Sequence, residues 1–452
     1  MKKLFGTDGI RGGAGVFPLD APTIEVIGSS LAGRLREKLG RPPLIVIGRD
    51  TRESGEWIEQ ALIAGASRIG AEVKSAGVIS TPGVAFLTRS LAADAGVVLS
   101  ASHNPFHDNG IKIFAPSGRK LDEETERLIE RDVFESNTDR SPTVSLSSTE
   151  SGTDADELSS HYLDFLANEI GKNLSLGGLR IVVDCANGAA SKLAPQLFHR
   201  LGASVTAINN TPDGRNINLD CGSLHTESLK EEVLKQKAAL GVALDGDADR
   251  SLFVDANGQL ANGDATLWVL AKYFRAQGRL QRDMVVATVM SNIGLELALK
   301  SQGIKLVRTD VGDKYVLEEL LQTGASLGGE QSGHIIFPEL SLAGDGLITT
   351  LCLLRAMSDE GKPLHDLTAG FETFPQILLN VKVKEKRPFV EVAAIQNAAR
   401  HIETQLGSRG RLLLRYSGTE PLARVMIEGE SQSEIEAQAQ ELADVIREAL
   451  GS

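Results

Sequence analysis

The sequence predicts an α/β protein of several domains, with three similar units and a smaller α+β domain at the C-terminal end. Each of the three units has a short apolar strand, a polar turn and then a helix, and the strands are expected at 44–47, 181–183 and 285–289. Short, nearly continuous apolar strands between helices favour mixed or parallel sheets that are covered on both faces. With 452 residues, the chain is longer than a single hydrophobic core supports, so three or four domains are expected.

The first unit shows the repeated plan most fully. The apolar run Leu44–Ile47 ends in a polar turn, and Ser54 can then cap a helix with apolar residues at helical spacing. Ala95–Leu99 supplies a further apolar strand. Residues 135–160 are rich in Ser, Thr and Asp, which predicts a linker or a surface excursion between domains.

The last part of the chain has a different pattern. Strands are expected there at 378–383, 412–416 and 425–428. Ser431 and Glu434 form a capping box for a final helix with one apolar face, made by Ile435, Ala439, Leu442, Ile446 and Leu450. This order of strands and helix predicts a small separate domain.

Composition and charge exclude some classes of function. The formal net charge of −13 argues against nucleic acid or an anionic membrane as the main partner. No apolar run approaches the length of a membrane helix, and the polar run 6–9 falls where a signal peptide would be apolar. Cys185, Cys221 and Cys352 are far apart and odd in number, which favours reduced thiols. We therefore expect a soluble cytoplasmic protein.

Ser102 is the first candidate for chemistry, because it follows the strand 95–99 in the run Ala101-Ser102-His103-Asn104-Pro105. A serine held at the end of a rigid strand is expected to be exposed, and its hydroxyl could accept and return a group such as phosphate. Ser, Asn and Pro also form ordinary turns, so a purely structural role remains open for this run on its own.

Asp245, Asp247 and Asp249 form the most specific pattern, between the apolar runs 242–244 and 252–254. In an extended segment, alternate side chains point to one side, so these three carboxylates would repel one another without a cation between them. A hard divalent ion with oxygen ligands, most simply Mg²⁺, would relieve that repulsion. The alternative is an acidic surface hairpin.

Two loops later in the chain carry groups suited to a sugar phosphate. The run 328–334 offers Glu330, Gln331, Ser332 and His334 as hydrogen-bonding groups, and the histidine can carry a proton near neutral pH. The run 415–421 and the residue Arg424 could bind a phosphate through Arg415, Ser417, Gly418, Thr419 and Arg424. A polar turn and a surface hairpin are the alternatives.

Arg11 and Lys112 could add positive charge around a phosphoryl group. Arg11 is framed by glycines in the run 5–12, and Lys112 lies ten residues after Ser102. By default, each would be a surface cation.

Taken in order, these segments resemble the α-D-phosphohexomutase superfamily across essentially the whole chain. The phosphoserine, metal, sugar and phosphate loops of that superfamily are matched by 101–105, 245–250, 329–334 and 415–421. The resemblance implies four domains around a central cleft. With the patterns above, it places a phosphoserine domain, a metal-binding domain, a sugar-binding domain and a phosphate-binding domain at 1–155, 156–256, 257–370 and 371–452.

Within the superfamily, the chain most resembles a bacterial branch that interconverts glucosamine 6-phosphate and glucosamine 1-phosphate. The residues that carry this resemblance are 5–12, Gln331 and 213–222. It implies that phosphorylated Ser102 and the three aspartates hold one Mg²⁺ per chain, and that a sugar 1,6-bisphosphate is the intermediate and activator.

The resemblance also implies roles for the other candidates. Arg415, Ser417, Gly418 and Thr419 would hold the phosphate that is not reacting, and Glu330 and Ser332 would hold sugar hydroxyls. Lys112 and His334 are the candidates for proton transfer, with Arg11 as an electrostatic partner of the transferring phosphoryl group.

Three alternatives remain. A phosphomannomutase or phosphoglucomutase would use the same chemistry. A phosphatase of the haloacid-dehalogenase type uses Asp-x-Asp-x-Thr, whereas the fifth position here is Asp249. A catalytically inactive sugar-phosphate sensor would leave Ser102 and the aspartates without a purpose. We expect small sugar phosphates as partners, no nucleic acid, no membrane, and a monomer or homodimer.

Overall fold

The computed structural model describes residues 3–6, 8–136, 152–417 and 420–451. By internal contacts the chain divides into two compact units: unit 1 is Met1–Arg282 with Gly312–Ala369, and unit 2 is Asp283–Val311 with Gly370–Ser452. Within the described ranges, no helix combines the length and apolar character needed to cross a membrane. The boundaries of the four expected domains stay a prediction, because this division does not test them.

The first sheet of unit 1 is mixed, with the strand order β1-β2-β6-β5-β3-β4. Its strands are β1 (Phe5–Gly6), β2 (Gly9–Gly13), β3 (Leu44–Arg49), β4 (Glu72–Val78), β5 (Ala95–Leu99) and β6 (Asp108–Phe114). β3 runs parallel to β4 and β5, whereas β6 runs antiparallel to β5, with Leu99 opposite Ile111. The expected strands 44–47 and 95–99 are therefore confirmed.

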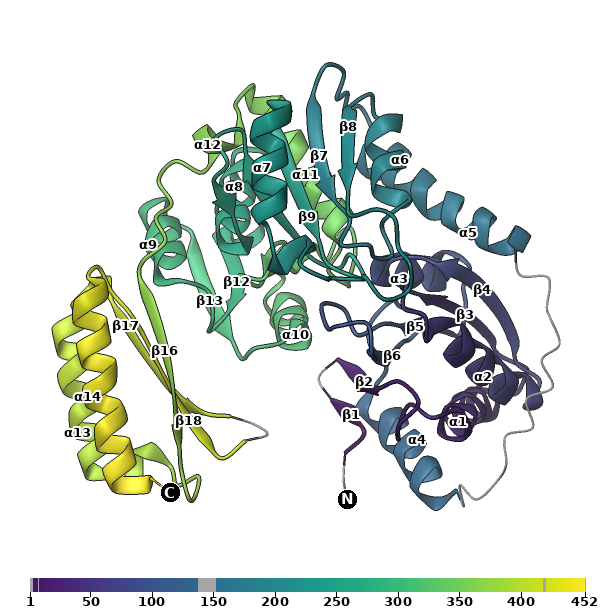
Figure 1. Ribbon diagram of the computed structural model, residues 1–452, viewed down its shortest axis with the longest axis horizontal. Coiled ribbons are helices and arrows are strands. Elements are labelled where there is room, and N and C mark those ends of the chain that lie inside the picture. The colour runs from purple at the N-terminus through teal and green to yellow at the C-terminus, as the bar shows by residue number, and fades with distance from the viewer. Residues whose placement is uncertain (1–2, 7, 137–151, 418–419, 452) are drawn as a thin grey trace. The chain divides into compact units, whose positions relative to one another are not determined.

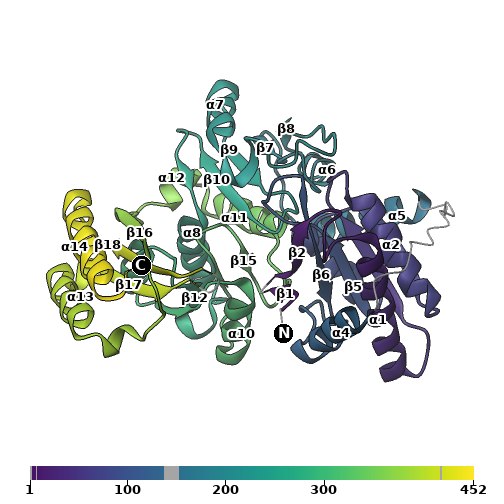
Figure 2. The same cartoon turned by 60° about the horizontal axis from the view of Figure 1, so that its bottom comes forward.

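Helices α1 (Ala21–Leu39), α2 (Gly55–Arg68), α3 (Thr81–Ser90) and α4 (Glu123–Glu135) accompany this sheet. Figure 2 shows α1 and α2 side by side, and their buried residues share one core with β3 and β5. Ser54 stands at the N-cap of α2, but its side chain makes no capping bond. Its Oγ instead accepts a hydrogen bond from Asn109 Nδ2 at 2.8 Å.

The second sheet of unit 1 repeats the same plan, with the order β11-β10-β9-β7-β8. Its strands are β7 (Arg180–Asp184), β8 (Ser204–Ile208), β9 (Leu240–Leu244), β10 (Ser251–Asp255) and β11 (Leu260–Ala261). β7 is parallel to β8 and β9, and β10 is antiparallel to β9. Helices α6 (Leu193–Arg200) and α7 (Glu227–Gln236) lie between these strands in the chain.

Part of the expected linker is helical. Helix α5 (Gly152–Phe165) continues into a π-helical turn over Leu166–Ile170, so the prediction of a linker is wrong for residues 152–160. The helix is anchored by buried Leu158 and Tyr162 and by stacking of Phe165 on Phe86, with ring centroids 4.3 Å apart. Residues 137–151 lie outside the described residues.

The remaining elements of unit 1 are short strands and helices. They are α8 (Gly263–Ala276), α10 (Asp313–Thr323), β14 (Gly328–Gly329), β15 (Ile335–Ile336), α11 (Gly346–Glu360) and α12 (Leu364–Leu367). β14 and β15 form an antiparallel pair, which positions the loop between them.

Unit 2 contains a parallel strand pair and a separate antiparallel sheet. The first part has β12 (Met284–Thr288), α9 (Ile293–Ser301) and β13 (Lys305–Thr309), with β12 parallel to β13. The second has β16 (Gln376–Lys382), α13 (Ala393–Leu406), β17 (Arg411–Tyr416), β18 (Leu422–Glu428) and α14 (Gln432–Leu450), with the strand order β16-β18-β17.

Helices α13 and α14 lie side by side along one face of this sheet (Figure 1). The predicted start of α14 is confirmed, because Ser431 Oγ accepts a hydrogen bond from Glu434 N at 3.4 Å. Its predicted apolar face is buried against β16 and β18. The expected α/β class, with mixed sheets and a smaller C-terminal α+β domain, is therefore confirmed.

Candidate active site

Ser102 lies in the turn after β5, and it adopts an unusual backbone conformation there. Its φ is 53°, in the left-handed region, which costs a non-glycine residue about 1–2 kcal/mol. The expectation of an exposed serine is wrong, since Ser102 is only 1% exposed. It is covered because the turn contacts the loop between β9 and β10, where Ser102 Oγ donates a hydrogen bond to Asp245 Oδ2 at 2.7 Å.

The three aspartates lie in that loop, and their carboxylates converge. One oxygen of each lies within 4.8 Å of the others, and all three residues are buried. The expectation of an extended segment is wrong, because residues 246–249 form a turn in which Ala248 has a φ of 55°. The carboxylates meet because the chain reverses direction, and not because side chains alternate along a strand.

The oxygen atoms of this metal turn (residues 245–249) fit a hard divalent cation. Asp247 Oδ1 and Asp249 Oδ1 are buried and accept no hydrogen bond from the described residues. Burial, together with the charges of Asp249 and Asp247, raises the pKa of Asp245 well above its usual value. A divalent cation would satisfy the orphaned oxygens and cancel the like-charge repulsion. The donors, carboxylates beside a hydroxyl, are of the kind that Mg²⁺ prefers.

Lys112 is a buried cation beside these carboxylates, and not the surface cation that is the default for a lysine. From β6, its Nζ lies 2.9 Å from Asp247 Oδ2, 3.1 Å from Asp8 Oδ2 and 3.5 Å from Asp249 Oδ2. Burial alone would lower the pKa of Lys112, but these three carboxylates outweigh it and raise the pKa well above its usual value. The three carboxylates therefore favour the protonated form of Lys112.

His334 and Arg11 reach the same cluster from other elements. The ring of His334 places Nδ1 3.6 Å from Asp249 Oδ1 and Nε2 3.8 Å from Asp313 Oδ2. Burial alone would lower the pKa of His334, but the nearby carboxylates, Asp249 first, raise it to about 9. Arg11, on β2, pairs with Asp8, and its buried Nε has no hydrogen-bond acceptor among the described residues. An incoming anion could supply that acceptor.

The predicted sugar loop is a fixed turn between β14 and β15. Glu330 Oε1 accepts a hydrogen bond from Gly312 N at 3.1 Å, and Ser332 Oγ donates to Glu330 Oε2 at 3.3 Å. Gln331 Nε2 donates to Asp264 Oδ2 at 3.3 Å. The three side chains are only partly buried, so their polar atoms can exchange these contacts for a ligand.

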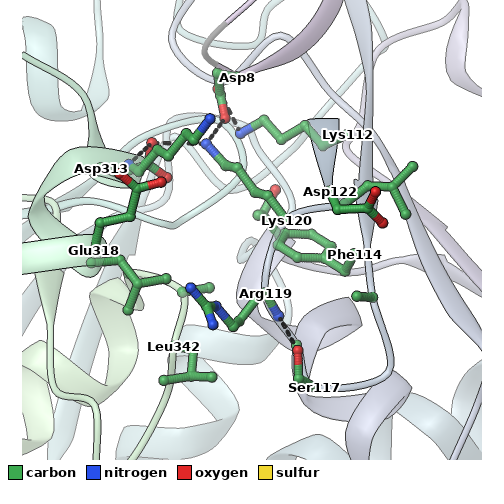
Figure 3. A pocket seen from close by; sticks show the side chains of 18 of the residues that line it. Asp8, Lys112, Phe114, Ser117, Arg119, Lys120, Asp122, Asp313, Glu318 and Leu342 are labelled. Carbon is green, nitrogen blue, oxygen red and sulfur yellow. Dashed lines mark hydrogen bonds and ion pairs between the residues drawn. The ribbon is translucent and has the colours of Figure 1, made fainter. Parts of the chain in front are cut away.

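A cavity of about 580 Å³ opens beside the charged cluster, and its lining includes Asp249, His334 and Lys112. Lys112 is labelled in Figure 3. In its wall, Lys120 Nζ lies 2.8 Å from Asp8 Oδ1 and 2.7 Å from Asp313 Oδ1. Lys120 and Asp313 had no predicted role. The available signal was weak, a basic pair at 119–120 shortly after Lys112.

Arg250 and His103 are further members of the site that received no predicted role. Arg250 Nη1 donates to His103 Nδ1 at 2.9 Å, and that nitrogen lies 3.5 Å from Ser102 Oγ. Burial and the charge of Arg250 lower the pKa of His103 to about 4. Both residues directly follow a predicted site residue, which was the signal that could have identified them.

The predicted phosphate loop belongs to unit 2, at the hairpin between β17 and β18. Arg415 and Arg424 face each other across the two strands, and burial and the charge of Arg424 lower the pKa of Arg415. Arg424 Nη2 lies 3.5 Å from Ser417 Oγ, whereas the buried Arg424 Nε has no acceptor among the described residues. Neighbouring like charges with an unsatisfied N–H favour an anion. Gly418 and Thr419 lie outside the described residues.

This combination of folds and charged loops matches a known class of enzymes. Four models of the phosphoglucomutase/phosphomannomutase family match in order: domain I at 2–140, domain II at 160–258, domain III at 262–374 and the C-terminal domain at 378–445. A solved structure of a family member from Burkholderia thailandensis superposes with a TM-score of 0.78 at 22% identity, covering 99% of this chain and 98% of that one. The class is that of the hexose-phosphate mutases.

More similar sequences narrow the class. A phosphoglucosamine mutase of Solibacter usitatus is 48% identical over 450 residues, covering 100% of this chain and 99% of that protein. The chain therefore belongs to the phosphoglucosamine mutase family, and it is an enzyme, an intramolecular phosphotransferase of the isomerase class. An N-acetylphosphoglucosamine mutase of Aspergillus fumigatus, solved with GlcNAc-6P and magnesium, shares the fold at a TM-score of 0.64 and 19% identity, covering 100% of this chain and 96% of that one. The alternatives of a haloacid-dehalogenase-type phosphatase and an inactive sensor are wrong.

Proposed function

We propose that the enzyme interconverts glucosamine 6-phosphate and glucosamine 1-phosphate through phosphorylated Ser102. The observation that carries this proposal is the hydrogen bond of 2.7 Å from Ser102 Oγ to Asp245, within a buried carboxylate triad. The hydroxyl proposed to carry the phosphoryl group thus lies beside carboxylates that could hold a divalent cation, and that cation would neutralise the charge of the phosphoryl group. The substrate is taken from the name of the relatives.

The proposed reaction has two balanced steps through glucosamine 1,6-bisphosphate, which is also the activator. In the first, the bond between Ser102 Oγ and phosphorus breaks and Ser102 Oγ takes up a proton, while a sugar hydroxyl oxygen bonds to phosphorus and releases its proton. In the second, Ser102 Oγ loses its proton and bonds to the phosphorus of the other phosphoryl group, while the sugar oxygen that this group leaves takes up a proton. The net change moves the phosphate between two positions of one sugar.

Ser102, Asp245, Asp247 and Asp249 are proposed to hold one Mg²⁺ per chain. When bound, the ion would neutralise charge on the transferring phosphoryl group. The Aspergillus fumigatus structure, which is a complex with magnesium, supports Mg²⁺ as the cation. Lys112 and His334 are proposed to carry protons, because both bear an N–H beside the triad, and Arg11 is proposed to face the phosphoryl group.

The remaining site residues are proposed to bind the substrate. Glu330, Gln331 and Ser332 would bind the polar groups of the sugar. The residues proposed for the non-reacting phosphate are Arg415, Ser417, Gly418, Thr419 and Arg424. Sugar phosphates are thus the proposed partners. The three cysteines are free and buried, which supports the cytoplasm as the proposed location.

Substrate assays test the proposal. The purified enzyme, supplied with Mg²⁺ and a sugar 1,6-bisphosphate, should show a higher kcat/KM for glucosamine 6-phosphate than for glucose or mannose 6-phosphate. Equal or higher kcat/KM on mannose 6-phosphate would reassign it to the phosphomannomutase alternative. Gln331→Ala should narrow the difference in kcat/KM between these substrates, because the amide of Gln331 is proposed to bind a polar group of the sugar.

A further inference from the structure

We infer that Arg52 and Asn218 are positioning residues that hold the nucleophile turn, residues 102–108, in its reactive conformation. The inference rests on the proposed role of Ser102. It concerns two residues that contact the backbone of this turn, and neither has a role in the proposed mechanism.

Arg52 is buried, with 1% of its surface exposed, and its guanidinium binds the backbone of this turn. Its Nη1 and Nη2 donate to four backbone carbonyls of the turn: those of Ser102 at 3.0 Å, Asn104 at 2.8 Å, Asp108 at 3.0 Å and Pro105. A planar fork with several fixed donors can hold four carbonyls at once, which the single ammonium of a lysine cannot do.

The ion pair between Arg52 and Asp50 also fixes the other side of the Ser102 backbone. Asp50 is fully buried and accepts hydrogen bonds from Arg52 Nε at 2.9 Å and from Ser100 Oγ at 2.6 Å. Ser100 Oγ in turn accepts from Ser102 N at 2.9 Å. The N–H and the C=O of Ser102 are therefore both tied to one buried ion pair. A non-glycine residue keeps a left-handed conformation only when several surrounding contacts hold it there, and these hydrogen bonds are such contacts.

Asn218 reaches the same carbonyls from the loop after β8. Its Nδ2 donates to Ser102 O at 2.9 Å and to Asn104 O at 3.1 Å. The metal turn packs directly against this contact. A Cβ on Gly246 would lie only 2.5 Å from Ser102 O and 2.9 Å from Asn218 Nδ2. Arg52 and Asn218 thus both donate to the Ser102 carbonyl, in a space without room for another side chain.

This arrangement predicts a specific kinetic consequence. Arg52 and Asn218 direct these hydrogen bonds to backbone carbonyls, so their loss should misdirect Ser102 Oγ without removing a substrate contact. Phosphoryl transfer depends on in-line positioning, and a misplacement of about 1 Å can cost about a hundredfold in rate. Removing these hydrogen bonds should therefore lower kcat and leave KM nearly unchanged.

The pair Asn218→Asp and Asn216→Asp tests the inference. At the first position, an aspartate would keep the size of the side chain and tolerate the φ of 59°, but it would present oxygen to two carbonyls that need a donor. Asn216 lies in the same loop, but its Nδ2 donates to Thr211 O at 3.1 Å within that loop, so Asn216→Asp is the matched control.

Single-turnover transfer from glucosamine 1,6-bisphosphate to Ser102 should be measured together with steady-state kcat, KM and Tm. For Asn218→Asp we expect transfer and kcat to fall about tenfold to a hundredfold, with KM within about twofold of wild type and Asn216→Asp near wild type. Arg52→Lys should lower transfer and kcat at least as much. If that buried variant does not fold, the comparison of Asn218→Asp with Asn216→Asp still tests the inference.

The inference would be overturned by a wild-type transfer rate in Asn218→Asp, or by an equal fall in transfer rate in both asparagine variants. It would also be overturned if Asn218→Asp changed KM alone. Failure of the proposed function is distinguishable, because wild-type enzyme would then form no phosphoserine at all.

Discussion

The metal turn of unit 1 and the phosphate loop of unit 2 differ in how they handle charge. The carboxylates of Asp245, Asp247 and Asp249 are buried and already balanced in part by Lys112 and His334. Arg415 and Arg424 are half-buried, and within the described residues no carboxylate lies at ion-pair distance from Arg415. The first region is held together by its own ion pairs, whereas the second keeps positive charge available for an anion. This difference fits the proposed roles of the two regions, in which the first performs phosphoryl transfer and the second binds the phosphate that is not reacting.

The largest effect is expected from the residue that the metal turn contacts directly. Ser102→Ala should lower kcat at least about a thousandfold, because the phosphoryl group would have no oxygen to transfer from. Tm should change little, since one hydroxyl is lost. Full turnover by a folded variant free of wild-type enzyme would show that Ser102 is not the carrier.

Asp247→Asn should have the next largest effect, about a hundredfold in kcat, because it removes a charge that would hold the cation. Isothermal titration with Mg²⁺ should show weaker binding than in wild type. Chelation of wild-type enzyme should mimic the variant, and added Mg²⁺ should restore activity to wild type only. Unchanged activity in metal-free buffer would assign the triad a structural role.

Arg415→Ala should have a smaller effect and on a different parameter. A charged hydrogen bond to a phosphate contributes about 1.5–3 kcal/mol, so KM for the sugar phosphate should rise about tenfold or more. More bisphosphate should also escape during turnover, while Ser102 still becomes phosphorylated. Unchanged KM and unchanged release of bisphosphate would remove Arg415 from the substrate site.

Arg411→Ala, at the start of the same strand β17, is the matched control for that result and should affect activity least. Arg411 Nη2 already pairs with buried Glu428 at 2.9 Å, and its Nη1 donates to Val289 O at 2.9 Å. Its loss leaves the buried carboxylate of Glu428 without an ion-pair partner among the described residues, so Tm should fall while KM stays within about twofold. If KM rose as much in Arg411→Ala as in Arg415→Ala, the existing ion pair of Arg411 would not explain a difference in function between the two arginines.

Local patterns in the sequence predicted much of the fold and most of the candidate site residues. The strand 95–99 and the apolar face of α14 follow from periodicity, and Ser102 and the aspartates stand in short runs directly after apolar strands. Local patterns could not predict the contacts between loops that are distant in sequence. Ser102 is buried because residue 245 meets it, and Lys120 faces Asp313 across 193 positions. Arg52 likewise has no local signal, because its acceptors are carbonyls about fifty residues further on.

The assignment on which the proposed mechanism depends is that Ser102 carries the phosphoryl group beside the carboxylate triad. It can be checked by incubating wild-type enzyme with glucosamine 1,6-bisphosphate and Mg²⁺, measuring the intact mass, and locating the added group by peptide mapping. We expect one phosphoryl group per chain on Ser102, which is lost to added glucosamine 6-phosphate at the rate of turnover. A phosphoryl group on another residue, or none on an enzyme that turns over, would contradict this assignment.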